Sequence, residues 1–233
     1  MLHNLKLHLL ILSIFIVLPM TGIGQVNRFE VSGETGTNVL FLWANKNENN
    51  TEQPRFGFST GVSFRYNFHK NFSIETNPAI DRKRSYAPNA TIDEEPDPFF
   101  GSVDIASQYD CLTIPIRVRY SVGKKVKFFV SVGPYFSYMF DLSFLFKYES
   151  GSEVGPLRYT GFYKQFEFGV SSSIGLAVPI TDFLQFHFEF RNNTGLNDIG
   201  NGKSAFASSR KTNTIVPLLG MTYTFGKQLE QKQ

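Results

Sequence analysis

Residues 126–141 read VKFFVSVGPYFSYMFD, and this stretch decides the fold. Every second residue from Val126 to Phe140 is apolar, aromatic or proline, whereas the intervening residues include lysine, serine, glycine and aspartate. Successive side chains of a β-strand point to opposite faces, so an alternation of period two indicates a strand rather than a helix. The stretch therefore predicts a long β-strand whose two faces meet different surroundings.

The same alternation recurs along the chain after Gln25, where no stretch has the periodicity of a helix. Each segment is long enough to cross a membrane as a tilted strand, which takes about 9 to 11 residues. The predicted strands are approximately Arg28 to Leu42, Phe56 to Phe68, Asn71 to Ser85, Tyr109 to Ser121, Lys125 to Tyr148, Phe162 to Val178, Asp182 to Arg191 and Thr212 to Phe225.

The composition tells which face meets lipid. The chain has 233 residues with 25 Phe but only 18% charged residues, below the roughly 25% of a soluble domain. The polar faces are mostly Ser, Thr, Gly and Asn, which fit a narrow lumen but make a poor soluble surface. A soluble lipocalin-like barrel is the alternative, and the absence of a Gly-x-Trp opening argues against it. The sequence thus predicts an all-β, eight-stranded antiparallel up-and-down transmembrane β-barrel.

The connections support this prediction because long loops alternate with tight turns, as in outer-membrane barrels, whose short turns face the periplasm. The long loops are Ala44 to Arg55, Tyr86 to Gln108, Glu149 to Gly161 and Asn192 to Lys211; the turns are His69-Lys70, Val122 to Lys125 and Pro179 to Asp182. Both mature termini are then expected in the periplasm. Aromatic girdles at the membrane surfaces are expected from Trp43, Tyr66, Phe68, Tyr120, Phe183, Tyr223 and Phe225.

The N-terminus has the pattern of a secretory signal. Lys6 precedes the apolar run Leu9 to Met20, which is too short to span a bilayer as a helix, and small residues lead to Gly24. We expect residues 1–24 to be the signal peptide, 25–226 the barrel and 227–233 a short tail; a buried N-terminal helix is the alternative. Loss of Lys6 changes the net charge from +3 to +2, which predicts no nucleic-acid partner.

Charged residues on the inward faces predict a paired network, since buried charges must be paired. The inward set is Glu30, Glu34, Arg65, Glu75, Arg117, Arg119, Lys127, Asp141, Glu167, His187, Glu189 and Arg191. A gated proton or solute path is one interpretation. We favour a structural plug, because eight strands enclose a space that side chains can fill.

Catalysis is a weaker hypothesis. His187 and Glu189 share an inward face and could form a base with its orienting acid, or ligate a metal, but spacing on one strand is weak evidence for either. His69 lies in a predicted turn with no acid beside it. We predict a protein that is not an enzyme, with no catalytic residue.

Other motifs indicate no cofactor or metal. Cys111 is expected to be a small inward filler, and the lone cysteine excludes a disulfide scaffold. Asp93 to Asp97 is acidic but lacks the ligand spacing of a calcium loop, so we expect a solvated loop. Gly33 and Gly36 form no phosphate loop, because no helix follows them.

Two strands carry a resemblance. The segment Tyr109-Asp-Cys-Leu-Thr-Ile-Pro-Ile-Arg-Val-Arg-Tyr120, then Phe128 to Tyr138 with its Gly-Pro-Tyr, and the ending Met221-Thr-Tyr-Thr-Phe225 resemble the outer-membrane β-barrel family widespread in Bacteroidetes, which includes PorT-like proteins. The resemblance covers nearly the whole mature chain and implies no site residue. PorT-like members imply a role in protein secretion. The tail Gly226 to Gln233 departs from the family pattern, in which the last strand ends in Phe.

We expect a protein of the Gram-negative envelope, and three function classes follow. The first, which we favour, is a monomeric structural or interaction barrel in contact with outer-membrane lipid. Its recognition loops would be Tyr86 to Gln108 and Asn192 to Lys211. The second is a secretion accessory that binds envelope proteins, and the third is a lipid-modifying enzyme.

Overall fold

The computed structural model describes residues 29–44, 52–90, 103–148, 151–158, 163–200 and 210–225. Ten strands lie in these ranges: β1 (Phe29–Ala44), β2 (Gln53–Asn67), β3 (Phe72–Thr76), β4 (Ala79–Ala90), β5 (Val103–Val122), β6 (Lys127–Tyr148), β7 (Glu153–Arg158), β8 (Phe166–Pro179), β9 (Leu184–Gly195) and β10 (Arg210–Phe225). Each of the predicted segments overlaps at least one strand.

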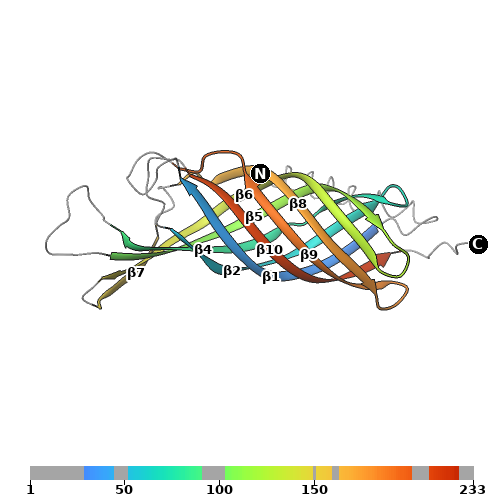
Figure 1. Cartoon of the computed structure of the whole chain (residues 1–233), viewed down its shortest axis with the longest axis horizontal. Helices are drawn as coiled ribbons and strands as arrows, with labels where there is room; N and C mark the ends of the chain where they lie inside the picture. Colours follow the sequence, from blue (N-terminus) through green and yellow to red (C-terminus); the bar gives the residue numbers. More distant parts are fainter. Residues whose placement is uncertain are drawn as a thin grey trace, which may run out of the picture.

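The strands form one antiparallel sheet that closes on itself (Figure 1). Hydrogen-bonded pairing runs in a ring through eight strands, from β1 through β2, β4, β5, β6, β8, β9 and β10 and back to β1. Closure places Phe29 of the first strand opposite Phe225 of the last. Because a closed ring has no free edge, its strands satisfy their backbone N–H and C=O groups on both sides.

The predicted segment Asn71 to Ser85 is two strands, which corrects the sequence prediction. β3 and β4 both lie between β2 and β5, and the chain breaks between them at Asn77 and Pro78. Proline has no backbone N–H to donate to a ladder. Its carbonyl accepts a hydrogen bond from the Val62 N–H at 3.1 Å, which keeps β2 attached across the break. β3 and β4 therefore share one position in the ring.

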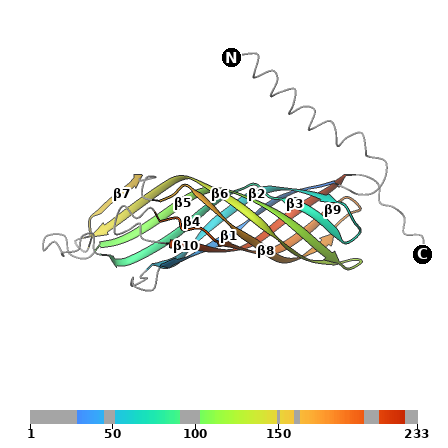
Figure 2. The ribbon, with the colours of Figure 1, turned by 90° about the horizontal axis from the view of Figure 1, so that it is seen from above.

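A further strand, β7, lies in the expected loop Glu149 to Gly161. Among the described strands it pairs with β6 alone, from Ser143 opposite Arg158 to Lys147 opposite Glu153. With the far ends of β4, β5 and β6 it extends the sheet past the ring (Figure 2). The sequence did not predict this strand, because it contains Gly155 and Pro156, and both residue types are unusual inside strands.

The short connections lie at one end of the ring, as predicted. They are residues 68–71, 123–126 and 180–183. The first residue of β1, Phe29, and the last residue of β10, Phe225, lie at the same end of the ring. Gly123 has a φ of +123°, and a Cβ there would come within 2.0 Å of the Val126 carbonyl oxygen, so only glycine fits this turn.

The connections at the opposite end are shorter than predicted, because strands extend into them. β4 continues to Ala90 and β5 begins at Val103, so much of the expected loop Tyr86 to Gln108 is sheet. β9 likewise continues to Gly195 and β10 begins at Arg210. The acidic stretch Asp93 to Asp97 lies outside the described residues.

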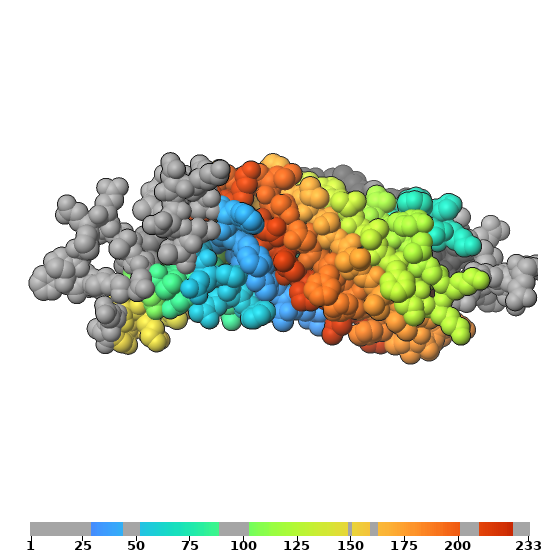
Figure 3. Space-filling model, viewed as in Figure 1, coloured from blue at the N-terminus to red at the C-terminus, as the bar shows by residue number. Residues whose placement is uncertain are grey.

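Side chains sort between the two faces as the alternation predicts. On β6, Phe128 and Val132 are more than half exposed, whereas Ser131 and Tyr135 are buried. Exposed apolar side chains cover the outside of the ring, including Phe58, Phe64, Ile74, Ile116, Val118, Phe168, Ile174, Phe190, Leu219 and Met221. Figure 3 shows neighbouring strands packed side by side across one face. An apolar surface of this extent is typical of contact with lipid.

A β-bulge in β6 changes which residues face inward. Asp110 lies opposite Asp141 but Cys111 lies opposite Met139, so Phe140 is an extra residue. Beyond the bulge Leu142 is buried and Asp141 is partly exposed, which contradicts the prediction that Asp141 faces inward. Lys127, also expected inside, is exposed at the start of β6.

The apolar belt has the height of a membrane. On β5 the outward residues are apolar or aromatic from Leu112 to Val122, whereas Gln108 and Asp104 beyond them are polar. A tilted strand of that length rises about 25 Å, the height of the apolar band of an outer-membrane barrel. The belt therefore places the ends of the ring at the two membrane surfaces.

Most of the predicted girdle aromatics gather at the turn end. Ring centroids are 5.0 Å apart for Phe72 and Tyr120, 5.7 Å for Phe183 and Tyr223, and 4.9 Å for Tyr223 and Phe225. Trp43 lies at the opposite end and is 64% exposed. The aromatic side chains therefore lie where tyrosine and tryptophan anchor a barrel in the interface.

The belt predicts a depth-dependent cost for charge. Val132→Arg, in the middle of the belt, should lower the free energy of unfolding by about 2–4 kcal/mol, whereas Val126→Arg at the turn end should cost about 0–1 kcal/mol. Urea unfolding of the protein in lipid vesicles measures both. Equal costs at the two positions would contradict the assignment of the belt to lipid.

Candidate functional site in the lumen

Glu75 of β3 is the centre of an ion-pair network in the turn half of the lumen. Its carboxylate lies 3.1 Å from Arg65 Nε, 3.0 Å from Arg117 Nη2 and 2.8 Å from Arg119 Nε. These arginines come from β2 and β5, the two strands that flank β3. The register of three adjacent strands thus brings the four side chains together.

Glu189 of β9 extends the network across the lumen. It lies 2.7 Å from Arg117 Nη1, 3.2 Å from Arg119 Nη2 and 2.9 Å from Arg191 Nε. Arg191 Nη2 is in turn 3.0 Å from Glu34 of β1. The network therefore ties opposite walls of the ring to one another.

Glu30 and two amides complete the network. Glu30 pairs with Arg65 and accepts a hydrogen bond from Asn67 at 2.9 Å. Asn77, at the break between β3 and β4, donates to Glu34 at 2.9 Å and accepts from Arg191 at 2.7 Å. These amides supply hydrogen bonds that the charged groups need once water is excluded.

The network balances its charges. Its acids are Glu30, Glu34, Glu75 and Glu189 and its bases are Arg65, Arg117, Arg119 and Arg191, none more than 8% exposed. Burying an unpaired charge is prohibitively costly, whereas a matched set is tolerated. Loss of any one member leaves an uncompensated charge in the lumen.

His187 belongs to this network and not to a catalytic pair with Glu189. Its Nε2 lies 3.3 Å from Glu34 and its Nδ1 lies 3.0 Å from the Thr222 hydroxyl. Glu189 is engaged by three arginines instead. A Cβ at Gly220 would come within 2.4 Å of the imidazole, so the ring is closely enclosed. The base-and-acid hypothesis therefore finds no support in the geometry.

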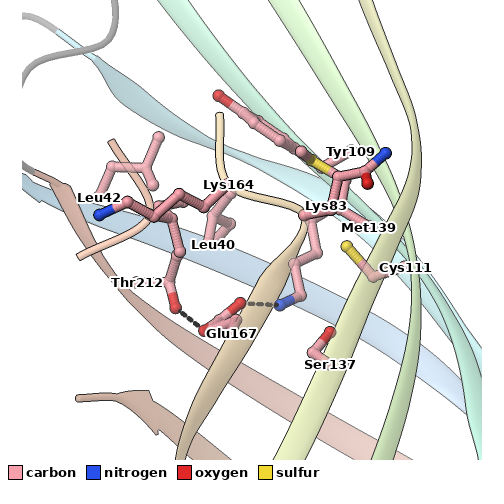
Figure 4. A pocket seen from close by; sticks show the side chains of 12 residues that line it. Leu40, Leu42, Lys83, Tyr109, Cys111, Ser137, Met139, Lys164, Glu167 and Thr212 are labelled. Carbon is pink, nitrogen blue, oxygen red and sulfur yellow. Dashed lines mark hydrogen bonds and ion pairs between the residues drawn. The ribbon is translucent and has the colours of Figure 1, made fainter. Parts of the chain in front are cut away.

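A second polar cluster lies nearer the loops, around Glu167 of β8 (Figure 4). Lys83 Nζ is 3.5 Å from Glu167, the Tyr135 hydroxyl donates to it at 2.5 Å, and Thr212 also donates to it. The predicted inward position of Glu167 is confirmed. Lys83 and Asp81 are absent from the predicted inward set, although both continue the alternation from Glu75 and are buried.

Beyond Glu167 the lumen becomes apolar. The residues that pack there are Leu40, Leu42, Val103, Ile105, Tyr109, Cys111, Met139, Leu142, Phe144, Tyr163 and Ile199. A cavity of about 20 Å³ remains between this apolar cluster and the Lys83–Glu167 pair, room for about one water molecule. Side chains therefore leave little space for water at this level.

The remaining predicted candidates form no site. Cys111 is free and buried in the apolar cluster, and His69 lies in an exposed turn where its Nδ1 accepts from the Asn71 N–H at 3.3 Å. Across the described strands and turns, no three His, Cys, Asp or Glu side chains are grouped to hold a metal ion. Within these same ranges there is also no helix long and apolar enough to cross a membrane.

A closed antiparallel ring, apolar outside and charged within, defines an integral outer-membrane barrel. The family model described as outer membrane protein beta-barrel domain matches residues 20–201, most of the chain. The chain belongs to this family, and the protein is an outer-membrane β-barrel protein.

The chain is also similar to outer-membrane proteins of known structure. Ail of Yersinia pestis is 13% identical with a TM-score of 0.41, covering 85% of this chain and 99% of Ail. OprG of Pseudomonas aeruginosa is 9% identical with a TM-score of 0.44, covering 87% and 100%. AlkL, studied in lipid bilayers, is 11% identical with a TM-score of 0.46, covering 90% and 96%. No curated protein matches the sequence.

The network predicts a large effect of a single truncation. Arg117→Ala leaves Glu75 and Glu189 short of one positive charge and should lower the free energy of unfolding by about 3–5 kcal/mol. Arg158→Ala, at an exposed ion pair with Asp141, should cost less than about 1 kcal/mol. Urea unfolding in vesicles compares the two variants, and equal costs would contradict the network's structural role.

Proposed function

We propose that the protein is a closed eight-stranded up-and-down barrel that does not conduct, and that it presents its sheet extension and long loops to a protein partner. The observation that carries this proposal is that side chains occupy the described lumen. The balanced ion-pair network fills the turn half and the apolar cluster fills the loop half. An eight-stranded barrel is just wide enough for side chains to fill it. We therefore assign the function to the sheet extension and the long loops.

In this proposal both termini lie in the periplasm and the long connections at the cell surface. Phe29 and Phe225 lie at the turn end, and short turns are periplasmic in outer-membrane barrels. A signal peptide over residues 1–24 exports the chain, residues 25–226 form the barrel and 227–233 form a short tail. Residues 1–28 and 226–233 lie outside the described residues.

The sheet extension is suited to recognition. β7 is exposed along its whole length, and Val154 and Leu157 add exposed apolar surface among charged neighbours. Lys147 and Glu153 form an exposed pair at 3.7 Å beside them. Apolar side chains within a polar rim are typical of transient protein interfaces.

The alternatives make different demands on the molecule. An accessory of protein secretion, implied by the resemblance to PorT-like proteins, would present the same surface to an envelope complex. A lipid-modifying enzyme would need an accessible catalytic set, but His187 is 1% exposed and held within the ion-pair network. The geometry favours the interaction barrel.

Conductance tests the sealed lumen. Planar bilayers that contain the purified protein should show no ion-current steps, because side chains fill the lumen. Arg117→Ala should destabilise the barrel without opening it, since the rest of the network and the apolar cluster stay in place. A measurable current through either protein would overturn the proposal of a closed barrel.

Affinity capture tests the interaction role. The double variant Val154→Ser and Leu157→Ser should reduce recovery of a cell-surface partner from mild detergent at least severalfold. Val178→Ser with Ile180→Ser, at the turn end, is the matched control and should leave recovery unchanged. Recovery of a defined secretion complex would favour the secretion accessory, whereas undiminished capture by the β7 variant would exclude β7 as the binding surface.

A further inference from the structure

Arginines gather on the outside of the ring just past the apolar belt. On the outer face of β4, Arg82 and Arg84 follow Ile80, which is 41% exposed and belongs to the belt. Arg55 lies on the neighbouring strand β2, close to the exposed Phe58. Arg55, Arg82 and Arg84 therefore lie where the lipid acyl chains end and the headgroups begin.

Arg55 and Arg84 lie directly opposite each other in the β2–β4 register. Like charges at directly opposed positions on one face destabilise a sheet. Within the described residues neither guanidinium has a carboxylate partner: Arg84 Nη2 is 3.4 Å from Gln108 Oε1, and Arg55 lies 4.5 Å from the Tyr86 ring centroid. Within the described ranges, the fold thus holds two exposed positive groups together with no carboxylate paired to either.

The surroundings hold Arg55 in position. The Tyr86 hydroxyl donates to Asp104 at 2.5 Å, which fixes the ring beneath Arg55, and this hydrogen bond raises the pKa of Tyr86. Arg82 differs, because Asp110 already neutralises it through two hydrogen bonds of 2.8 and 2.9 Å. Arg55 and Arg84 are therefore the pair available to a ligand.

We propose that Arg55 and Arg84 bind the phosphate group of an anionic lipid in the leaflet on the loop side. Guanidinium groups bind phosphate through paired, charge-assisted hydrogen bonds. Opposed residues on adjacent strands are about 5 Å apart at Cα, so both side chains can reach one phosphate. The acyl chains of the same lipid would lie along Ile80 and Phe58, directly below. This continuity favours a lipid over a soluble anion.

Native mass spectrometry of the full-length protein in a neutral detergent tests the proposal, with phosphatidic acid as the probe. The wild type should bind phosphatidic acid in preference to phosphatidylcholine. Arg55→Gln with Arg84→Gln should weaken this binding at least tenfold. Lys124→Gln with Lys125→Gln removes the same charge from the exposed turn at the other end and should leave binding unchanged.

Thermal unfolding supplies a second measurement. Phosphatidic acid should raise the Tm of the wild type and of the turn variant but not that of the Arg55 and Arg84 variant, because a ligand stabilises only the folded protein that binds it. Without lipid, the Arg55 and Arg84 variant should be at least as stable as the wild type, since it loses a like-charge contact. Undiminished lipid binding by this variant, an equal loss in the turn variant, or binding of inorganic phosphate as tight as that of phosphatidic acid would each overturn the proposal.

Discussion

The hydrocarbon interior of a membrane offers the backbone no hydrogen-bond partner, and the rest of the structure depends on this constraint. The sheet has to close, so β1 pairs with both β2 and β10. Closure in turn encloses every inward side chain in a narrow space without bulk water. Charges there have to meet opposite charges, as Glu75 does with three arginines. The outer face contacts lipid and needs no polar side chains, so it carries many of the phenylalanines.

Much of the fold follows from alternation alone. The two-residue period is a direct consequence of strand geometry, so it predicts the strands, their two faces and the end at which the turns lie. It fails where the backbone departs from that geometry. Pro78 breaks a strand by removing a donor, and the extra residue Phe140 shifts the pattern of β6, which moves Asp141 outward and Leu142 inward. The bulge depends on pairing with β5, which β6 read by itself does not reveal.

The sequence predicts that charged residues line the lumen, but it does not predict which of them pair with one another. Alternation places Glu34, His187 and Glu189 inside, and electrostatics requires that they be paired. Which groups meet depends on the register between strands far apart in sequence, and this register places His187 against Glu34 rather than Glu189. Arg55 and Arg84 went unnoticed for a related reason: each is ordinary on its own strand, and only the β2–β4 register makes them neighbours.

The pairing of β1 with β10 also sets an order of assembly. Phe29 meets Phe225, and the ion pair between Arg191 and Glu34 joins residues 157 positions apart in the chain. Contacts of such sequence separation form late, because a long chain has to be brought together before they contribute. β10 follows the other strands of the ring in the chain, so the ring cannot close until β10 has been synthesised. Until then β1 and β9 each keep an unpaired edge, and the carboxylate of Glu34 has yet to meet the guanidinium that will neutralise it. Closure of the ring and the pairing of Glu34 with Arg191 are therefore completed together.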